Sequence, residues 1–528
     1  MSWSRIRLHK DSVAYGASIL MGSSLVLNLL GICYRLILAR DLGAQGLALY
    51  HLTISFYTIL SGIAISGLTT SVSQGAAYLS GSGHSKQIPL LLQRCVFIFF
   101  LIYTILLVLA LPLSPFLAKT LLGSENHCTL IALLFPYMLL TGIENIYKAL
   151  FLGLGKTMLP SISEIIEQSI RILLLPQIIW VANAYSPSSR VACLLFTMFL
   201  GEIFASSFML IGYLRHKKTI SCGNNQSTSS ANINKIILSI AMPTLSSGLC
   251  VRIISSGCSI FLPLCLVWSG LNQQDANHIY GTFTGMTMPL LTMCTAITMP
   301  LFTAVMPKIS KATASGNLSL CRRKCGKLIH ITSLIVLPSM AILLLCPKEI
   351  SMLLYGDPYP GSLCTMFIPC ITLSMFAGAS TFMLSSMGHN GLSGILTVSS
   401  GILQLLNLWL GIVVLKGGLL GYAILETIND LFILSFGITI VCKKCGLKIM
   451  WKNWLIKPLC ALAPSLLIAF TLFSWLGSLN SPLWLQTILP SVILLCLYVL
   501  FLVFAGGLNI TRYLSTLLDK KTPELPRV

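Results

Sequence analysis

The sequence predicts an all-α polytopic membrane protein with about 14 spanning helices. Only 9% of its 528 residues are charged, 55% are hydrophobic, and the mean hydropathy is +0.87. Soluble domains carry about 25% charged residues. Water cannot solvate so apolar a surface, whereas a bilayer can. The net charge of +20 does not indicate nucleic-acid binding, because the basic residues lie in short connections between apolar runs.

The spanning segments follow from their length. A helix needs roughly 20 apolar residues to cross about 30 Å of hydrocarbon. The first apolar run follows Arg5, Arg7 and Lys10 and is too long for a signal peptide, so we expect a retained first helix. The predicted spans lie near 12–36, 47–72, 89–113, 128–152, 159–182, 190–214, 236–268, 279–305, 327–346, 363–387, 391–414, 418–441, 455–477 and 484–506.

The basic residues predict the orientation. With the N-terminus in the cytoplasm, inner segments hold 26 of the 34 Lys and Arg residues, outer connections hold six, and two lie within spans. Inner loops of membrane proteins carry this excess of positive charge. Omitting one span would exchange inner and outer loops downstream and remove the asymmetry. We therefore expect both termini in the cytoplasm. No connection is long enough for a soluble domain.

An internal repeat predicts two lobes. A shift of 233 positions places Pro136 on Pro369 and Gly155 on Gly388. Six spans separate the copies, so the halves are predicted to be parallel repeats, which commonly hold a substrate between lobes that rock against each other. The predicted parts are an N-terminal six-helix lobe at 1–220, a polar cytoplasmic linker at 221–235, a C-terminal six-helix lobe at 236–450, and two further helices with a basic tail at 451–528.

Ionisable residues within the spans are candidate functional residues, because each costs about 2.5–3.5 kcal/mol to insert. Glu164, Glu167 and Arg171 share one helix face at spacings of three and four. Glu167 can pair with Arg171, which leaves the partner of Glu164 open. The predicted intramembrane charges are Glu144, Glu164, Glu167, Arg171, Glu202, Glu426 and Asp430.

Two interpretations apply to these charges. Internal salt bridges would serve packing, whereas an open site would serve transport. Glu426 and Asp430 share a face and form either a polar seam between helices or part of such a site.

Arginines are the candidate substrate-binding residues. Arg252 has no acidic residue within one or two helical turns, so it needs a partner on another helix or an anion in a wet cavity. Its fork of donors suits phosphate. Arg35 and Arg40 flank the outer end of the first span, which is the repeat counterpart of the span that carries Arg252. We predict that Arg35 and Arg252 face the same gap, while Arg40 either binds substrate or extends to the interface.

The 18 cysteines do not indicate a disulfide framework, because most lie inside apolar runs, where cysteine behaves as a small hydrophobe. Cys442 and Cys445 form one C-x-x-C without a second pair or flanking histidines, so no zinc site is expected. The sequence predicts no cofactor and no catalytic residue.

Two motifs carry a resemblance to a known family. Tyr34–Gly43, followed by Gly46 and Tyr50, resembles the first helix and loop of polysaccharide exporters. The stretch Phe151–Pro160, continuing to Glu164, Glu167-Gln168 and Arg171, resembles the stage V sporulation protein B group. This group belongs to the multidrug/oligosaccharidyl-lipid/polysaccharide (MOP) exporter superfamily, together with the MurJ lipid II flippases.

The resemblance implies two six-helix lobes around a cationic cavity, with two extra helices. It implies a flippase in the bacterial cytoplasmic membrane that moves an undecaprenyl-pyrophosphate-linked peptidoglycan or polysaccharide precursor for the spore cortex. The arginines would grip the pyrophosphate while the lipid tail stays in the bilayer. Membrane lipids are the other expected partners. The energy source, through an ion or the membrane potential, and any protein partners stay open.

Three alternatives compete with this prediction. A cation-coupled drug antiporter of the same superfamily is supported by Glu144, Glu164 and Glu202. A membrane-embedded glycosyltransferase is disfavoured by the short outer loops. A scaffold that recruits cell-wall enzymes would tolerate loss of Arg252.

Overall fold

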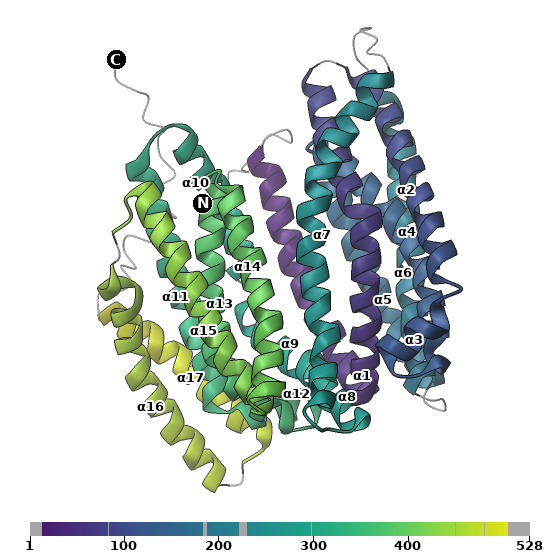
Figure 1. The fold of residues 1–528 in the computed structure, drawn as a ribbon. Coiled ribbons are helices and arrows are strands. Elements are labelled where there is room, and N and C mark those ends of the chain that lie inside the picture. The colour runs from purple at the N-terminus through teal and green to yellow at the C-terminus, as the bar shows by residue number, and fades with distance from the viewer. Residues whose placement is uncertain are drawn as a thin grey trace, which may run out of the picture. The chain divides into compact units, whose positions relative to one another are not determined.

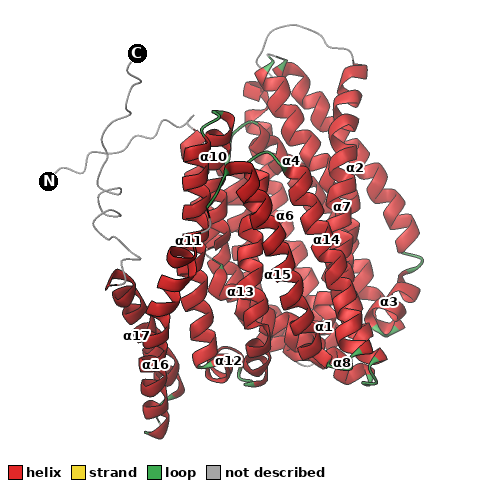
Figure 2. Cartoon of the chain, turned by 60° about the vertical axis from the view of Figure 1, so that its left-hand side comes forward, coloured by secondary structure: helices red, strands yellow, loops and turns green. Residues whose placement is uncertain are grey.

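The computed structural model describes residues 13–82, 84–182, 187–220, 230–296, 298–448, 450–479 and 481–504. Helices make up nearly all of these residues, and no strand occurs among them (Figure 2). Many large apolar side chains stay exposed, such as Leu173 at 68%, Leu467 at 67% and Trp475 at 59%. Such a surface suits lipid rather than water. The predicted class of α-helical, multi-pass membrane protein is confirmed.

Seventeen α-helices are labelled along the described chain (Figure 1). Short 3₁₀ turns lie at Ser85–Gln87 and Glu125–His127, and π-helical segments at Phe283–Thr287, Trp409–Val414 and Lys452–Ile456. The helices are α1 (Val13–Gly81), α2 (Ile88–Ala110), α3 (Ser114–Leu122), α4 (Cys128–Gly153), α5 (Met158–Ala182), α6 (Pro187–Ile220), α7 (Ser230–Trp268), α8 (Gln273–Thr282), α9 (Met288–Thr295), α10 (Thr298–Ala314), α11 (Leu318–Leu345), α12 (Pro347–Tyr355), α13 (Tyr359–Ser386), α14 (Asn390–Leu408), α15 (Gly418–Cys445), α16 (Lys457–Ser478) and α17 (Leu483–Phe504).

Eleven of the described helices are long and apolar enough to cross a membrane. Three differences separate this number from the predicted 14. Helix α1 contains two predicted spans, α5 is not among the eleven, and the predicted span 279–305 is divided among α8, a π-helical segment, α9 and α10. The count of 14 stays a prediction.

Gly43 divides α1 into two helical parts. Its backbone has φ 63° and ψ −179°, which interrupts the helical path between the predicted spans 12–36 and 47–72. A positive φ of this size favours glycine, because a Cβ atom would clash with the backbone. The part of α1 beyond Gly43 packs closely on α8, where a Cβ added to Gly281 would lie 1.7 Å from the carbonyl oxygen of Ala44.

Turn glycines and internal prolines occur at matching positions in the two predicted copies of the repeat. Gly123 ends α3 and Gly356 ends α12, both with left-handed backbone angles. The next helix in each copy, α4 and α13, carries an internal proline, Pro136 or Pro369. Each of these helices is followed by a turn glycine with positive φ, at 155 and at 388. The arrangement of the copies as two lobes stays a prediction.

Internal contacts divide the chain into two compact units. The first unit comprises Met1–Pro289 and Asn390–Asn429, and the second comprises Leu290–His389 and Asp430–Val528. In the first unit α4, α5 and α6 pack on one another and on α1. In the second unit α16 and α17 pack on α11 through a buried apolar cluster of Ala341, Leu345, Cys346, Ala469 and Leu494. The predicted domain boundaries at 220, 235 and 450 stay predictions.

Candidate functional site

Charged side chains from α4, α5 and α6 converge inside the first unit. Lys148 lies among three carboxylates. Its Nζ atom is 3.0 Å from Oε1 of Glu144 and 3.8 Å from a carboxylate oxygen of both Glu164 and Glu167. The Lys148 side chain is only 9% exposed and that of Glu144 only 1%, whereas that of Glu164 is 46% exposed. The partner of Glu164 that the sequence left open is therefore Lys148.

Lys148 is a charged residue of this site that is not among the predicted intramembrane charges. It lies within the predicted span 128–152, and in the structure it is buried within α4. Its position four residues after Glu144 is the signal that would have placed it, since residues at this spacing face each other on a helix.

Arg171 joins α5 to α4 and α6. It forms the predicted ion pair with Glu167 on its own helix, and its Nη2 atom lies 3.6 Å from Oε1 of Glu202 on α6. The same Nη2 atom donates a 3.0 Å hydrogen bond to the hydroxyl oxygen of Tyr137 on α4, and the guanidinium carbon lies 5.7 Å from the centre of that ring. Arg171 thus ties the three helices together.

Two hydroxyl groups complete the surroundings of the carboxylates. Thr141 Oγ1 donates a 2.8 Å hydrogen bond to Glu202, and Ser163 Oγ donates a 2.5 Å hydrogen bond to Glu144. Oxygen atoms of Glu144, Glu167 and Glu202 all lie within 4.8 Å of one another. The second carboxylate oxygen of Glu202 is buried without a hydrogen-bond partner.

This charge network, formed by Glu144, Lys148, Glu164, Glu167, Arg171 and Glu202, has more acids than bases. Four carboxylates and two cations give a formal charge of −2. Like charges held this close in a buried site repel strongly unless protons or a cation compensate them. The network is therefore suited both to holding α4, α5 and α6 together and to taking up protons or a small cation.

The candidate arginines lie elsewhere in the first unit. Arg35 and Arg252 are both exposed. Arg35 lies close enough to His51 to act on it electrostatically, whereas the Cδ atom of Arg252 packs against Gly62. His51 and Gly62 are eleven residues apart on α1, which corresponds to roughly 16 Å along a helix axis. Arg35 thus acts on a different level of α1 from the one against which Arg252 packs, and the pairing of the two arginines across one gap stays a prediction. Arg40 is also exposed.

Glu426 and Asp430 on α15 contact different helices. Glu426 accepts hydrogen bonds from Asn407 of α14 at 3.1 Å and from Asn429 at 3.2 Å, all within the first unit. Asp430, in the second unit, accepts a hydrogen bond from Cys370 of α13 at 3.5 Å. Each acid thus has a hydrogen-bond partner on a neighbouring helix of its own unit, and both the polar seam and the transport site stay predictions.

Comparisons with known proteins agree with the resemblance found in the sequence. The polysaccharide biosynthesis protein family matches residues 13–313. Stage V sporulation protein B of Bacillus subtilis (strain 168) is 24% identical over 389 residues, which cover 72% of this chain and 74% of that protein.

Solved structures share the fold. The inward closed conformation of the lipid II flippase MurJ matches with a TM-score of 0.67 at 12% identity, covering 95% of this chain and 100% of that one. The inward-facing conformation of a multidrug resistance MATE family transporter of the MOP superfamily matches with a TM-score of 0.63 at 16% identity, covering 81% and 98%. The chain therefore shares the fold of these two proteins. The names of these structures describe a flippase and a transporter, which agrees with the prediction that the chain is not an enzyme.

Proposed function

The chain belongs to the polysaccharide biosynthesis protein family, and on that premise we propose that it moves a lipid-linked peptidoglycan or polysaccharide precursor across the bacterial cytoplasmic membrane by alternating access. The likeness to the lipid II flippase MurJ supports a lipid-linked cargo. The likeness to stage V sporulation protein B supports a role in sporulation, and we propose that this role is formation of the spore cortex. Both termini lie in the cytoplasm in this proposal.

The observation that carries the proposal is Arg252. It lies near the middle of α7, within an apolar span, and its side chain is exposed. Among the described residues, no carboxylate forms an ion pair with it. An uncompensated cation at bilayer depth is costly unless it meets water or an anion. The pyrophosphate of an undecaprenyl-linked glycan is such an anion, and guanidinium groups bind phosphate through paired, charge-assisted hydrogen bonds.

The proposal is tested in vesicles that contain the purified protein and a fluorescent undecaprenyl-pyrophosphate-linked disaccharide-peptide. The measured quantity is the rate at which the label becomes accessible to a quencher that cannot cross the membrane. Arg252→Ala is expected to lower this rate about tenfold or more, since a charge-assisted hydrogen bond contributes about 1.5–3 kcal/mol and each 1.4 kcal/mol is tenfold. Arg252→Lys should retain part of the rate because it keeps the charge.

The matched control is Arg94→Ala, which removes an exposed arginine from α2 of the same unit. It should leave the rate unchanged. An Arg252→Ala protein that externalises the precursor as fast as the wild type would remove this residue from the substrate path. Full cortex formation by the same variant in cells would favour the scaffold instead.

A second candidate is a cation-coupled drug antiporter. The charge network favours it, because its formal charge of −2 offers a place for a coupling proton or cation inside the first unit. The likeness to a multidrug resistance transporter supports the same alternative. Vesicles with an imposed proton or sodium gradient should then extrude a fluorescent cationic dye, and Glu202→Gln should abolish this efflux. The control is Glu125→Gln, which alters an exposed carboxylate.

A further inference from the structure

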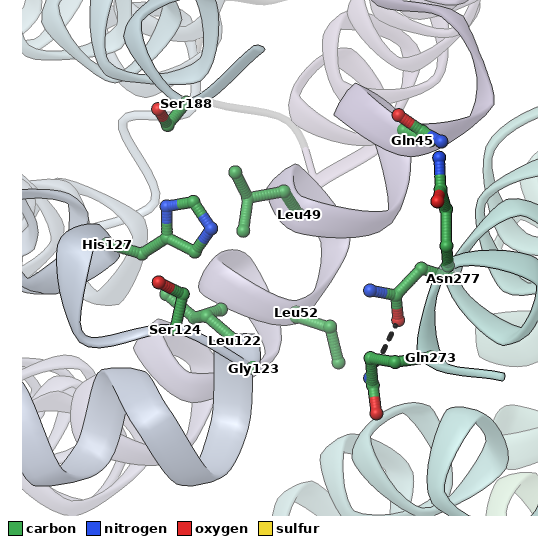
Figure 3. Close-up of a pocket in the computed structure, with 11 residues that line it drawn as sticks. Gln45, Leu49, Leu52, Leu122, Gly123, Ser124, His127, Ser188, Gln273 and Asn277 are labelled. Atoms are coloured by element: carbon green, nitrogen blue, oxygen red, sulfur yellow. Dashed lines mark hydrogen bonds between the residues drawn. The ribbon is translucent and has the colours of Figure 1, made fainter. Parts of the chain in front are cut away.

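A pocket with no role in the charge network opens in the first unit. Its volume is about 500 Å³, within the range of about 300–1,000 Å³ typical of small-molecule sites. The pocket is built by α1 just beyond the bend at Gly43, by the turn between α3 and α4, by the start of α6, and by α8 (Figure 3). The predicted topology places the connections that follow the predicted spans 89–113 and 236–268 outside the cell. In that topology the pocket lies at the outer end of the helices.

The polar side chains of the pocket are neutral. Four amides line it: Gln45 on α1, and Gln273, Gln274 and Asn277 on α8. Among its described lining residues there is no lysine, arginine, aspartate or glutamate. An ionised ligand would therefore lose water on entering without gaining a countercharge. This chemistry disfavours phosphates, carboxylates and ammonium groups.

The pocket also offers both hydrogen-bond donors and acceptors. Gln273 Nε2 donates a 3.3 Å hydrogen bond to Asn277 Oδ1, which fixes two of the amides relative to each other and uses only part of their capacity. On the opposite side lie His127 and Ser124, with Leu49 and Leu52 between the two polar sides (Figure 3). Nδ1 of His127 is buried without a hydrogen-bond partner.

We propose that this pocket binds a neutral, hydroxyl-rich saccharide. Sugar hydroxyls both donate and accept hydrogen bonds, as side-chain amides do. The apolar face of a sugar ring suits the leucine surface between the two polar sides. The inference rests on the proposed function: the pocket holds the glycan end of the cargo at the outer side of the membrane, away from the arginine that would bind its pyrophosphate.

The test measures binding of N,N′-diacetylchitobiose, a soluble neutral disaccharide, to the full-length protein in detergent by saturation-transfer NMR and calorimetry. The wild type should bind it, and inorganic pyrophosphate should not displace it. Gln45→Ala/Asn277→Ala should raise the apparent Kd about tenfold or more, since it removes a hydrogen-bonding amide from two elements of the pocket. Gln93→Ala, which removes an exposed glutamine from α2, should bind like the wild type.

A second measurement needs no variant. A diazirine derivative of the disaccharide, photolysed with the wild-type protein, should label peptides from Gln273–Thr282 or Glu125–His127. Labelling confined to other segments, absence of binding, or equal binding by the double variant and the wild type would overturn the proposal. The two proposals fail separately. Saccharide binding without externalisation of the precursor would contradict only the flippase, and externalisation without saccharide binding would contradict only the pocket.

Discussion

Replacing Lys148 with methionine removes the ammonium group that contacts three carboxylates of the charge network. Methionine preserves the length and the apolar stem of the side chain. The change leaves the Glu144 carboxylate, which is 1% exposed, with a hydrogen bond from the Ser163 hydroxyl but no cation beside it among its described contacts. The formal charge of the network falls from −2 to −3. Removing one partner of a buried ion pair costs about 3–5 kcal/mol, because the other charge stays buried and uncompensated.

This cost translates into a measurable shift of the melting temperature. With an unfolding entropy of about 2.1 cal/mol/K per residue, a chain of 528 residues loses roughly 1 °C for each 1 kcal/mol. Lys148→Met should therefore lower the melting temperature by about 3–5 °C. The shift can be measured by differential scanning fluorimetry of the protein in detergent.

Two further variants separate the electrostatic cause from lost packing. Adding Glu144→Gln to Lys148→Met neutralises the carboxylate left unpaired and should restore more than half of the lost stability. Lys119→Met removes a 2.8 Å ion pair with Glu125 whose side chains are 66% and 59% exposed, and it should leave the melting temperature unchanged, since water screens exposed pairs. A single variant as stable as the wild type, or a double variant no more stable than the single, would refute the reasoning.

Three other predictions test separate parts of the fold. Gly43→Ala should lower the stability by about 1–3 kcal/mol, because φ 63° with ψ −179° lies in a region that essentially only glycine adopts. Its denaturation midpoint should lie below that of Gly31→Ala, which alters a helical glycine with free space around it, and equal midpoints would contradict the prediction. Oxidation with diamide should join Cys325 of α11 to Cys445 of α15, whose buried thiols lie close enough to interact. A disulfide-linked peptide pair in mass spectrometry checks this, and persistence of two free thiols would contradict the prediction. Asn407→Leu should destabilise the chain by about 1–3 kcal/mol, because a carboxylate oxygen of Glu426 loses its 3.1 Å donor. A melting curve like that of the wild type would show that this hydrogen bond does not stabilise the fold.

Local sequence patterns predicted much of the fold. Leaving aside small shifts at helix ends, hydropathy located most of the helices, and Gly123, Gly155, Gly356 and Gly388 stand at turns with positive φ, where glycine is favoured by its lack of a Cβ atom. The pair Glu167–Arg171 also followed from spacing alone, since it lies within one helix. The pair Glu144–Lys148 has the same spacing of four within one helix, so spacing could equally have predicted it.

Contacts between helices were decided only by the tertiary structure. Glu202 lies more than 30 residues from Arg171 in the sequence, and Glu164 of α5 pairs with Lys148 of α4. Hydropathy contains no information about which faces of these helices meet. The same holds for the neutral pocket, whose Gln45, His127 and Asn277 come from three distant segments. The sequence by itself determined that the chain spans a membrane through apolar helices, because that depends on the transfer of each segment from water to lipid. Which charges compensate each other depends on helix packing, because ion pairing requires distances of a few ångströms that only the folded chain brings about.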